Sequence, residues 1–561
     1  MLTGTQAAPP EEKPQNGIAG LKHIRYDAVA GLVVSLVSLP LSSGIAIASG
    51  APPIYGIISS VIAGLIFPFV GGSFVTISGP AAGLAPALLA IMAALGGAGD
   101  ADHVGAGYHM LLAVICIVGV AQVIMARLKL ARYAGIFPAS VVEGMLGAIG
   151  VLILVKALPL FFGYLEPVHA HGFFEYVAEI PHWVAGGNLN ISLVGAAGLA
   201  AMLAAVSGGA RKHRLFQVVP PHIFAVFIGI AATVFLHLGA DDPGFLISVP
   251  ANPLDGISFP AFGELLRRSD LWQAAAIGVV TLTLIDGVES LATAQAIDRI
   301  DPFARRSEPN RVLRAMGVSN IVSSLLGGLT VIPGGVKSKT CIEAGGRTLW
   351  ANFFNAVFLL MFLFVAPVLL GLIPKATLGA ILVYTGWKMV HPSIGRHLAT
   401  IGREQIALYT LTILATLATD LLVGVLVGTA AKLALLAWYG QKAAASAGRP
   451  TPLLAMLADF FRTPIFELTM REDGSADIFL DRPLVCFNSY KLHEEISGLP
   501  DTVGTVHITL GPGVLVCDHT SIEGLITATE RNLDVHGLEE MRALSPHQAS
   551  IHIVPAPLQH A

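Results

Sequence analysis

Apolar runs of membrane-spanning length dominate this sequence. From about Val29 to Tyr439 the chain is a series of apolar stretches, many of them near the roughly 20 residues that cross a bilayer as a helix. Mean hydropathy is +0.71, and only 12% of the residues are charged, whereas a soluble protein carries about twice that fraction. The chain is therefore predicted to be a polytopic membrane protein whose membrane domain is all-α.

About fourteen apolar segments are expected from hydropathy and from Gly and Pro breaks. In chain order they lie at about 29–49, 54–70, 80–95, 108–126, 138–156, 190–206, 218–237, 272–296, 311–326, 336–345, 351–372, 376–390, 404–418 and 420–438. The third and the tenth are short and rich in Gly and Pro, so we do not expect them to cross the membrane alone. Lys and Arg recur in alternate loops, which predicts an even number of crossings with both termini in the cytoplasm.

The composition changes after Gly440. A linker over 441–454 is followed by a charged region in which polar and apolar residues alternate, as is typical of strands. We therefore expect a small cytoplasmic α/β domain over 455–561, after a cytoplasmic N-terminal segment over 1–26 and a transmembrane domain over 27–440. Within the last domain, strands are expected at 476–480, 483–487, 505–510 and 550–554, and helices at 492–497 and 521–532.

Several functional classes lack their sequence signatures. Lys plus Arg number 33 and Asp plus Glu 37, so there is no basic excess to bind nucleic acid. The four cysteines stand too far apart for a disulfide scaffold or a zinc site: Cys116, Cys341, Cys486 and Cys517. No nucleophile and base stand at a plausible spacing, so we do not expect an enzyme.

Two interrupted stretches resemble each other. Gly71–Pro80 and Gly327–Gly335 each combine a Gly-Gly pair, a short β-prone run and a Gly/Pro break before a half-length apolar segment. Paired interruptions predict a 7+7 inverted repeat with a binding site near the bilayer midplane. A helix that starts inside the membrane presents unpaired N–H groups and partial positive charge, so two facing helix starts attract an anion. The alternative is two re-entrant hairpins that serve only packing.

Ionisable residues inside the apolar segments mark candidate functional sites, because charge is costly there. Asp286, Glu289 and Thr293 in the eighth segment are spaced to share one helical face. A carboxylate with nearby oxygens suits Na⁺, and a carboxylate alone can carry a proton. Alternatively, Glu289 pairs with a cation, for which Lys337 is the candidate. Lys337 can instead supply positive charge to an anion.

Motifs spread in order along the membrane region carry a family resemblance. They are Asp27–Gly31, Leu39-Pro40, Ile45–Gly56, Ile77–Leu84, Asn310–Leu313, Gly317–Ile321 and Ala344–Thr348. Together they resemble the SulP (sulfate permease) family of anion transporters. The C-terminal domain is similar to a STAS domain, with Val516–Ser521 in place of the usual Asp-Ser-Thr-Gly-like turn. Phe137–Leu146, and Glu289–Leu291 followed by Asp298–Pro302, are most similar to a bacterial SulP branch often associated with carbonic anhydrases.

The resemblance implies core and gate domains, broken helices three and ten, and an anion held between those helices with helix one nearby. The implied anion-binding residues are Ser42, Ser43, Gly79, Pro80, Ala81, Ala82, Gly334, Gly335, Val336 and Lys337. In sodium-coupled members an acid and a threonine on helix eight bind Na⁺, which implies a Na⁺ site at Glu289, Thr293 and Gly334. Two departures are that Lys337 replaces the usual Arg and that Gly334 and Gly335 replace Ser or Thr. Asp286 stands where relatives tend to be small and apolar, which suggests either proton coupling or a preference for divalent anions assisted by protonation.

The family implies a secondary active transporter of inorganic anions, with bicarbonate uptake coupled to Na⁺ by an elevator mechanism as the leading hypothesis. The alternative is a proton-coupled transporter of sulfate or a dicarboxylate, or an anion exchanger; a channel-like conductance and a nucleobase permease are further alternatives. We expect a multi-pass protein of the bacterial inner membrane, with both termini cytoplasmic. The family resemblance also implies a homodimer in lipid, a functional association with carbonic anhydrase, and no cofactor besides the coupling ion, Na⁺ or H⁺.

Overall fold

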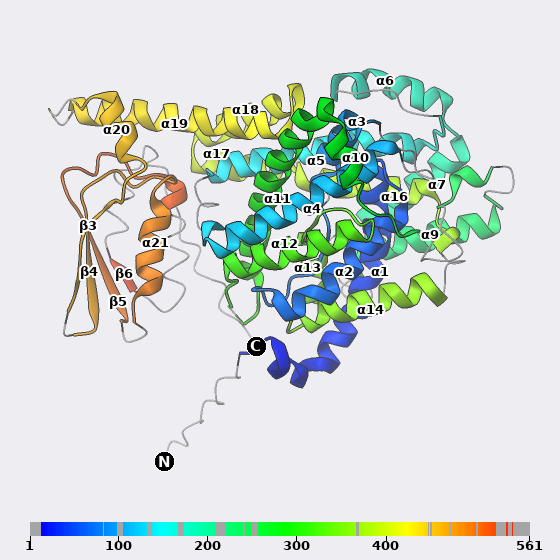
Figure 1. Cartoon of the computed structure of the whole chain (residues 1–561), viewed down its shortest axis with the longest axis horizontal. Coiled ribbons are helices and arrows are strands. Elements are labelled where there is room, and N and C mark those ends of the chain that lie inside the picture. The colour runs from blue at the N-terminus through cyan, green and yellow to red at the C-terminus, as the bar shows by residue number, and fades with distance from the viewer. Residues whose placement is uncertain are drawn as a thin grey trace, which may run out of the picture. The chain divides into compact units, whose positions relative to one another are not determined.

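Helices form the greater part of the described chain (Figure 1). The computed structural model describes residues 13–81, 83–97, 105–131, 137–166, 173–207, 219–238, 242–247, 256–303, 305–365, 370–446, 448, 451–471, 473–500, 503–522, 525, 534–536 and 541. Contacts divide the chain into two units. One comprises Met1–Ala131 and Ile149–Met389, and the other comprises Arg132–Ala148 and Val390–Ala561.

Each apolar segment expected from the sequence contains a helix. In chain order these are α1 (Ile24–Ala48), α2 (Pro53–Val70), α3 (Ala85–Ala94), α4 (Ala106–Arg127), α5 (Ala139–Phe162), α7 (Leu189–Val206), α9 (Pro221–Phe235), α11 (Trp272–Ile300), α12 (Pro309–Leu325), α13 (Gly335–Glu343), α14 (Trp350–Val365), α16 (Lys375–Met389), α18 (Arg403–Ala418) and α19 (Leu421–Ser446). The sequence did not predict α6 (Phe173–Gly186), α10 (Phe262–Arg267) or α17 (Pro392–Ile401). The predicted all-α membrane domain is confirmed.

Length and apolar composition qualify seven helices of the described chain as candidate membrane spans, and α3, α9 and α14 are shorter apolar helices. On α4 the exposed residues Ile117, Val120 and Ile124 recur at helical spacing, while Leu111 and Val118 are buried. A helix that exposes large apolar side chains on one face and buries them on the other suits a lipid neighbour on the exposed face.

A two-stranded ribbon interrupts the helices. β1 (Ser78–Pro80) pairs antiparallel with β2 (Val331–Pro333), with Ser78 opposite Pro333 and Pro80 opposite Val331. The ribbon leads into the two shortest of the helices that occupy the predicted segments, α3 with 10 residues and α13 with 9. The β-prone runs and the broken third and tenth helices expected from the sequence are thus confirmed.

The Gly-Gly pair before each strand lies against a helix of the other half of the membrane region. A Cβ on Gly72 would lie 2.7 Å from the carbonyl oxygen of Glu308, just before α12, and the Glu308 N–H donates to the Gly72 carbonyl at 2.7 Å. In turn, a Cβ on Gly328 would lie 3.0 Å from Oγ of Ser59 in α2, and that Oγ accepts from the Leu329 N–H at 2.7 Å. Both turns therefore need a residue without a side chain.

The C-terminal region contains a four-stranded sheet with the order β3-β4-β5-β6 (Figure 1). β3 and β4 are antiparallel, whereas β4, β5 and β6 run parallel. The strands are β3 (Ile465–Met470), β4 (Ser475–Leu480), β5 (Thr505–Leu510) and β6 (Asp534–His536), with α20 (Leu453–Asp459) and α21 (Ser489–Gly498). This is the small α/β region that the alternating sequence predicts.

Individual predictions in this region had mixed outcomes. The strands at 476–480 and 505–510 and the helix at 492–497 are confirmed. The strand at 483–487 is wrong, because the Asn488 amide accepts from the Val485 N–H at 2.9 Å, donates to the Pro483 carbonyl at 2.8 Å and closes a turn. The strand at 550–554 and most of the helix at 521–532 lie outside the described residues.

The last apolar helix, α19, is attached to the α/β region. Its residues Leu436, Ala437 and Ala444 belong to one buried apolar cluster with Val485 and Val516. Lys432 of α19 donates from Nζ to Asp518 Oδ1 at 2.6 Å, and both side chains are at most 4% exposed. Burial tends to raise the pKa of Asp518, but attraction to Lys432 outweighs burial and holds this pKa below its ordinary value of 3.8.

Replacing Asp518 by Asn should destabilise the protein by about 3 kcal/mol or more, because the Lys432 ammonium would stay buried without a counter-charge. The measurement is chemical denaturation in detergent between pH 5 and pH 8. The lowered pKa keeps Asp518 ionised over that range, so the difference in unfolding free energy between parent and variant should be constant. The stability that ionised Asp518 contributes is lost only as pH falls below 3.8 through the folded-state pKa. The double variant Lys432→Met/Asp518→Leu removes both charges and should recover stability. A double variant no more stable than Asp518→Asn would contradict this account.

Candidate functional site

Two hydrogen bonds fix the start of α13 to Ile77, the residue before strand β1, and a third within α13 orients the serine that takes part. The Gly334 N–H donates to the Ile77 carbonyl at 2.8 Å, and the Ile77 N–H donates to Ser338 Oγ at 2.9 Å. Ser338 Oγ in turn donates to the Gly334 carbonyl at 2.7 Å. The predicted broken segments therefore meet at the ribbon, and the N–H groups at the start of α13 lie next to β1.

Lys337, in the first turn of α13, extends its ammonium group to two serines. Its Nζ donates to Ser42 Oγ of α1 at 2.9 Å and to Ser60 Oγ of α2 at 3.1 Å. The two serine oxygens are themselves hydrogen-bonded at 2.8 Å. A Cβ on Gly79 of β1 would lie 2.5 Å from both Lys337 Nζ and Ser60 Oγ, so only glycine allows this approach. Lys337 is 2% exposed.

The Lys337 ammonium has no carboxylate partner among the described residues. Two of the three N–H donors of a lysine go to neutral hydroxyls, so the positive charge is not compensated. A buried charge without a counter-ion is costly. The position is therefore suited to a negatively charged ligand. The alternative in which Lys337 pairs with Glu289 does not hold here.

Glu289 lies against Gly83, just after the first interrupted stretch. A Cβ on Gly83 would be 2.5 Å from both carboxylate oxygens of Glu289. Glu289 is 6% exposed, and its Oε2 has no hydrogen-bond partner within the part of the chain that the structure describes. Half-buried Thr293, one turn along α11, lies beside Gly335, whose added Cβ would be 3.8 Å from Thr293 Cγ2. A buried carboxylate with nearby oxygens and no cation partner suits a small cation.

Asp286 has a different environment from Glu289. It is fully buried, and its Oδ2 accepts hydrogen bonds from the Gln122 amide at 2.6 Å and from the Asn320 amide at 2.9 Å. The two predicted acids of α11 therefore differ: two amides hold Asp286 Oδ2, whereas Glu289 Oε2, like Asp286 Oδ1, has no hydrogen-bond partner among the described residues.

The remaining predicted residues lie at or near the ribbon, and their contact with a ligand stays a prediction. Ser43 is buried on α1, and Ala81 is buried directly after β1. Pro80 is opposite Val331 in the ribbon. At the start of α13, Gly335 is exposed and Val336 is half-buried. Ala82 lies outside the described residues.

Comparison with known proteins identifies the family. Residues 24–412 match the model of the sulfate permease family. The chain belongs to this family. It is 25% identical over 413 residues to the bicarbonate transporter BicA of Picosynechococcus sp., an alignment that covers 72% of this chain and 69% of BicA.

Two solved structures share the fold of this family member. The transmembrane domain of a cyanobacterium bicarbonate transporter BicA aligns with a TM-score of 0.62 and 22% identity, over 72% of this chain and 98% of that one. SLC26A9 aligns with a TM-score of 0.64 and 17% identity, over 93% of this chain and 86% of its own. The protein is therefore a polytopic integral membrane protein and an anion transporter of the sulfate permease family, with a C-terminal region consistent with a STAS-like domain.

Four residues of the site were missed from the sequence: Ser60, Gly83, Gln122 and Asn320. Ser60 and Gln122 are polar residues inside apolar segments, the signal that singled out Asp286 and Glu289. Gly83 and Asn320 were noted only as parts of family motifs. Their partners depend on how the helices pack, and hydropathy carries no information about packing.

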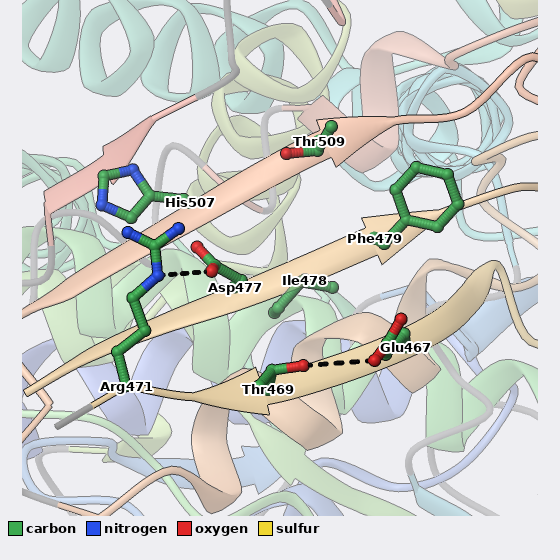
Figure 2. Close-up of a pocket in the computed structure, with 8 residues that line it drawn as sticks. All are labelled: Glu467, Thr469, Arg471, Asp477, Ile478, Phe479, His507 and Thr509. Carbon is green, nitrogen blue, oxygen red and sulfur yellow. Dashed lines mark hydrogen bonds and ion pairs between the residues drawn. The ribbon is translucent and has the colours of Figure 1, made fainter.

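A separate cavity of about 500 Å³ lies on the C-terminal sheet (Figure 2). Its lining residues are Glu467, Thr469, Arg471, Asp477, Ile478, Phe479, His507 and Thr509. Arg471 Nε donates to Asp477 Oδ2 at 2.6 Å, so the guanidinium charge in this cavity is already balanced. The cavity therefore lacks the uncompensated positive charge that distinguishes Lys337.

Lys337→Met should raise the KM for the transported anion about tenfold or more, because hydrogen bonds to a charged group are worth about 1.5–3 kcal/mol. The measurement is the initial rate of uptake into proteoliposomes against anion concentration. Lys339→Met is the matched control, since Lys339 is on the same helix and its side chain is 62% exposed. Equal KM values for the two variants would contradict a role for Lys337 in anion binding.

Gly83→Ala should impair uptake severely while the protein still folds, because the new Cβ would displace the Glu289 carboxylate. Uptake should also lose its response to the cation gradient. Gly287→Ala on α11 is the control, since a Cβ there meets nothing within 4 Å. If both variants respond to cations as the parent protein does, the close approach of Gly83 to Glu289 has no role in transport.

Proposed function

We propose that this protein imports bicarbonate together with Na⁺ by an elevator-type alternating-access mechanism. The observation that carries the proposal is the buried Lys337 ammonium beside the start of α13, which contacts two hydroxyl groups and, among the residues that the structure describes, no carboxylate. An anion bound there would neutralise the charge and accept a hydrogen bond from the remaining N–H donor.

The proposed anion site combines three kinds of donor. Lys337 supplies a charge-assisted donor, and Ser42 and Ser43 belong to the adjacent stretch of α1. Gly335 and Val336 would contribute backbone N–H groups with the partial positive charge of a helix start, whereas the N–H of Gly334 already donates to the Ile77 carbonyl and Gly334 would line the site. The interrupted stretch with Gly79, Pro80, Ala81 and Ala82 forms the opposite wall. The exposed Gly335 has no side chain to cover the N–H groups at the start of α13.

A singly charged anion matches the charge of this site. Lys337 carries one positive charge, and a helix start adds about half a charge. Sulfate carries two negative charges and would need a second cation or a proton to be balanced to the same extent. The relative BicA is named for bicarbonate, which agrees with this charge argument.

Na⁺ is proposed to bind at Glu289, Thr293 and Gly334, where carboxylate, hydroxyl and carbonyl oxygens are the ligands that hard cations prefer. Glu289 is buried without a cation partner in the described residues, so a bound Na⁺ would remove an unfavourable buried charge. Because Gly334 would belong to both sites, cation and anion would each favour the state that binds the other.

The second candidate is proton-coupled transport of sulfate or a dicarboxylate, or anion exchange. It is supported by Asp286, a second buried carboxylate one helical turn from Glu289, and by the name of the family. In that case Asp286 or Glu289 would carry a proton that offsets the second charge of the anion.

We further propose a 7+7 inverted repeat, supported by the reciprocal approach of Gly72 to Glu308 and of Gly328 to α2. The proposed domains are 1–26, 27–440, 441–454 and 455–561. The alternating Lys and Arg content of the loops supports cytoplasmic termini in a bacterial inner membrane. A homodimer and an association with carbonic anhydrase follow from the family resemblance alone.

Uptake of labelled bicarbonate and sulfate into proteoliposomes, with Na⁺ and proton gradients applied separately, tests the proposal. We expect an inward Na⁺ gradient to stimulate bicarbonate uptake in the parent protein. Glu289→Gln should abolish this stimulation while leaving the melting temperature close to the parent value. Glu343→Gln is the control, because that side chain is 54% exposed on α13. Sulfate uptake driven by protons and indifferent to Na⁺ would establish the second candidate instead.

A further inference from the structure

Asp286 is the centre of a buried polar network that joins three helices. Gln122 belongs to α4, Asp286 to α11 and Asn320 to α12, and all three side chains are fully buried. Besides donating to Asp286, the Asn320 amide donates to Gln122 Oε1 at 2.8 Å. Such a network is worth more when every member is satisfied, and it restricts each side chain to one orientation.

A close helix crossing allows the two amides to meet. α4 and α12 pack side by side (Figure 1). A Cβ on Gly119 would lie 2.6 Å from the Gly317 carbonyl oxygen, and a Cβ on Gly317 would lie 2.6 Å from the Gly119 carbonyl oxygen. Gln122 and Asn320 each stand three residues after these glycines, on the same stretch of their helices. The glycine crossing therefore brings both amides to one place.

The network ends on the ribbon of the anion site. Asn320 Oδ1 accepts the N–H of Val331, the first residue of β2, at 2.6 Å. Val331 is opposite Pro80 of β1, and two residues after Val331 the chain reaches Pro333 and then Gly334 at the start of α13. A single side chain, Asn320, thus connects the Asp286 carboxylate to the strand that precedes Lys337.

We propose that Asn320 and Gln122 are positioning residues for anion binding, which hold the ribbon and the start of α13 in place by tying β2 to Asp286. This inference rests on the proposed function, because it concerns how the proposed anion site is held. It assigns Asp286 the role of a fixed acceptor through one oxygen: Oδ2 takes two amide donors, while Oδ1, like Oε2 of Glu289, is without a partner in the described part of the chain. Asn320 contacts both β2 and Asp286, so its loss should matter more than the loss of Gln122.

Asn320→Ala should raise the anion KM about tenfold with kcat within about twofold of the parent, and Gln122→Ala should raise KM less. KM and kcat are measured from initial uptake rates, with the folded fraction counted by size-exclusion chromatography. Ser324→Ala is the matched control, because Ser324 is buried on α12 but its hydroxyl donates only within that helix, to Ile321 at 2.9 Å. A merely structural role would lower the folded fraction and kcat and leave KM unchanged, which would overturn the proposal.

A charge swap distinguishes positioning from direct ion binding. Asn320→Asp removes the donor to Asp286 and buries a second carboxylate beside it, so a large rise in KM is expected. In Asp286→Asn/Asn320→Asp the amide at 286 can donate to the carboxylate at 320, which can still accept from the Val331 N–H. The swap should return KM to within about threefold of the parent. A swapped variant as impaired as Asn320→Asp would show that Asp286 acts itself, and the positioning role would be refuted.

The test of the Asn320 variants does not depend on which ion is coupled to transport. The shift of the melting temperature by sodium bicarbonate and by sodium sulfate, measured on purified protein in detergent, reports anion binding without transport. A parent protein that binds an anion but shows no response to Na⁺ or to protons would refute coupled transport and leave the comparison of the Asn320 variants intact. If an anion shifts the melting temperature of the parent and of Asn320→Ala equally, only the positioning role would be refuted.

Discussion

The membrane part of this protein is organised around a buried ammonium group that has no counter-charge among the described residues. Removing Lys337 from water is costly, and two serine hydroxyls offset only part of that cost. The surrounding backbone is arranged around this group: Gly79 has no side chain where one would collide with Nζ, and α13 begins within one turn of it. Positive charge is therefore concentrated where the chain is least regular, and an anion is the simplest way to balance it.

Irregular backbone inside a membrane must satisfy its own hydrogen bonds, and the ribbon shows how this chain does so. β1 and β2 pair with each other, and the neighbouring N–H groups of Ile77, Leu329 and Val331 are taken by side chains of Ser338, Ser59 and Asn320. Each of these side chains comes from a different helix. The position of the ribbon consequently depends on several helices at once. A substitution in one of these helices can therefore alter the proposed anion site without contacting it.

The sequence was sufficient for those features that depend on local pattern. Apolar length located the helices, and the Gly-Gly pairs located the two broken segments, because both signals lie within about 20 consecutive residues. Predictions failed where a distant or unusual partner decides the structure. Ser60 and Asn320 were missed because their partners are set by helix packing. The strand at 483–487 was wrong because the Asn488 side chain closes a turn, and β3 was missed because both faces of that strand are largely exposed.

Two buried lysines of this chain differ in whether a carboxylate balances their charge. Lys432 meets the Asp518 carboxylate at 2.6 Å and lies next to an apolar cluster, so its charge is balanced and the pair serves to join α19 to the α/β region. Lys337 is as deeply buried, but the described residues offer it only neutral acceptors. A permanent carboxylate at Lys337 would lock the site, because a bound anion could not compete with a fixed counter-charge. In the proposed transport cycle the counter-ion would bind and leave, and the hydroxyl partners would hold the ammonium group in position while no anion is bound.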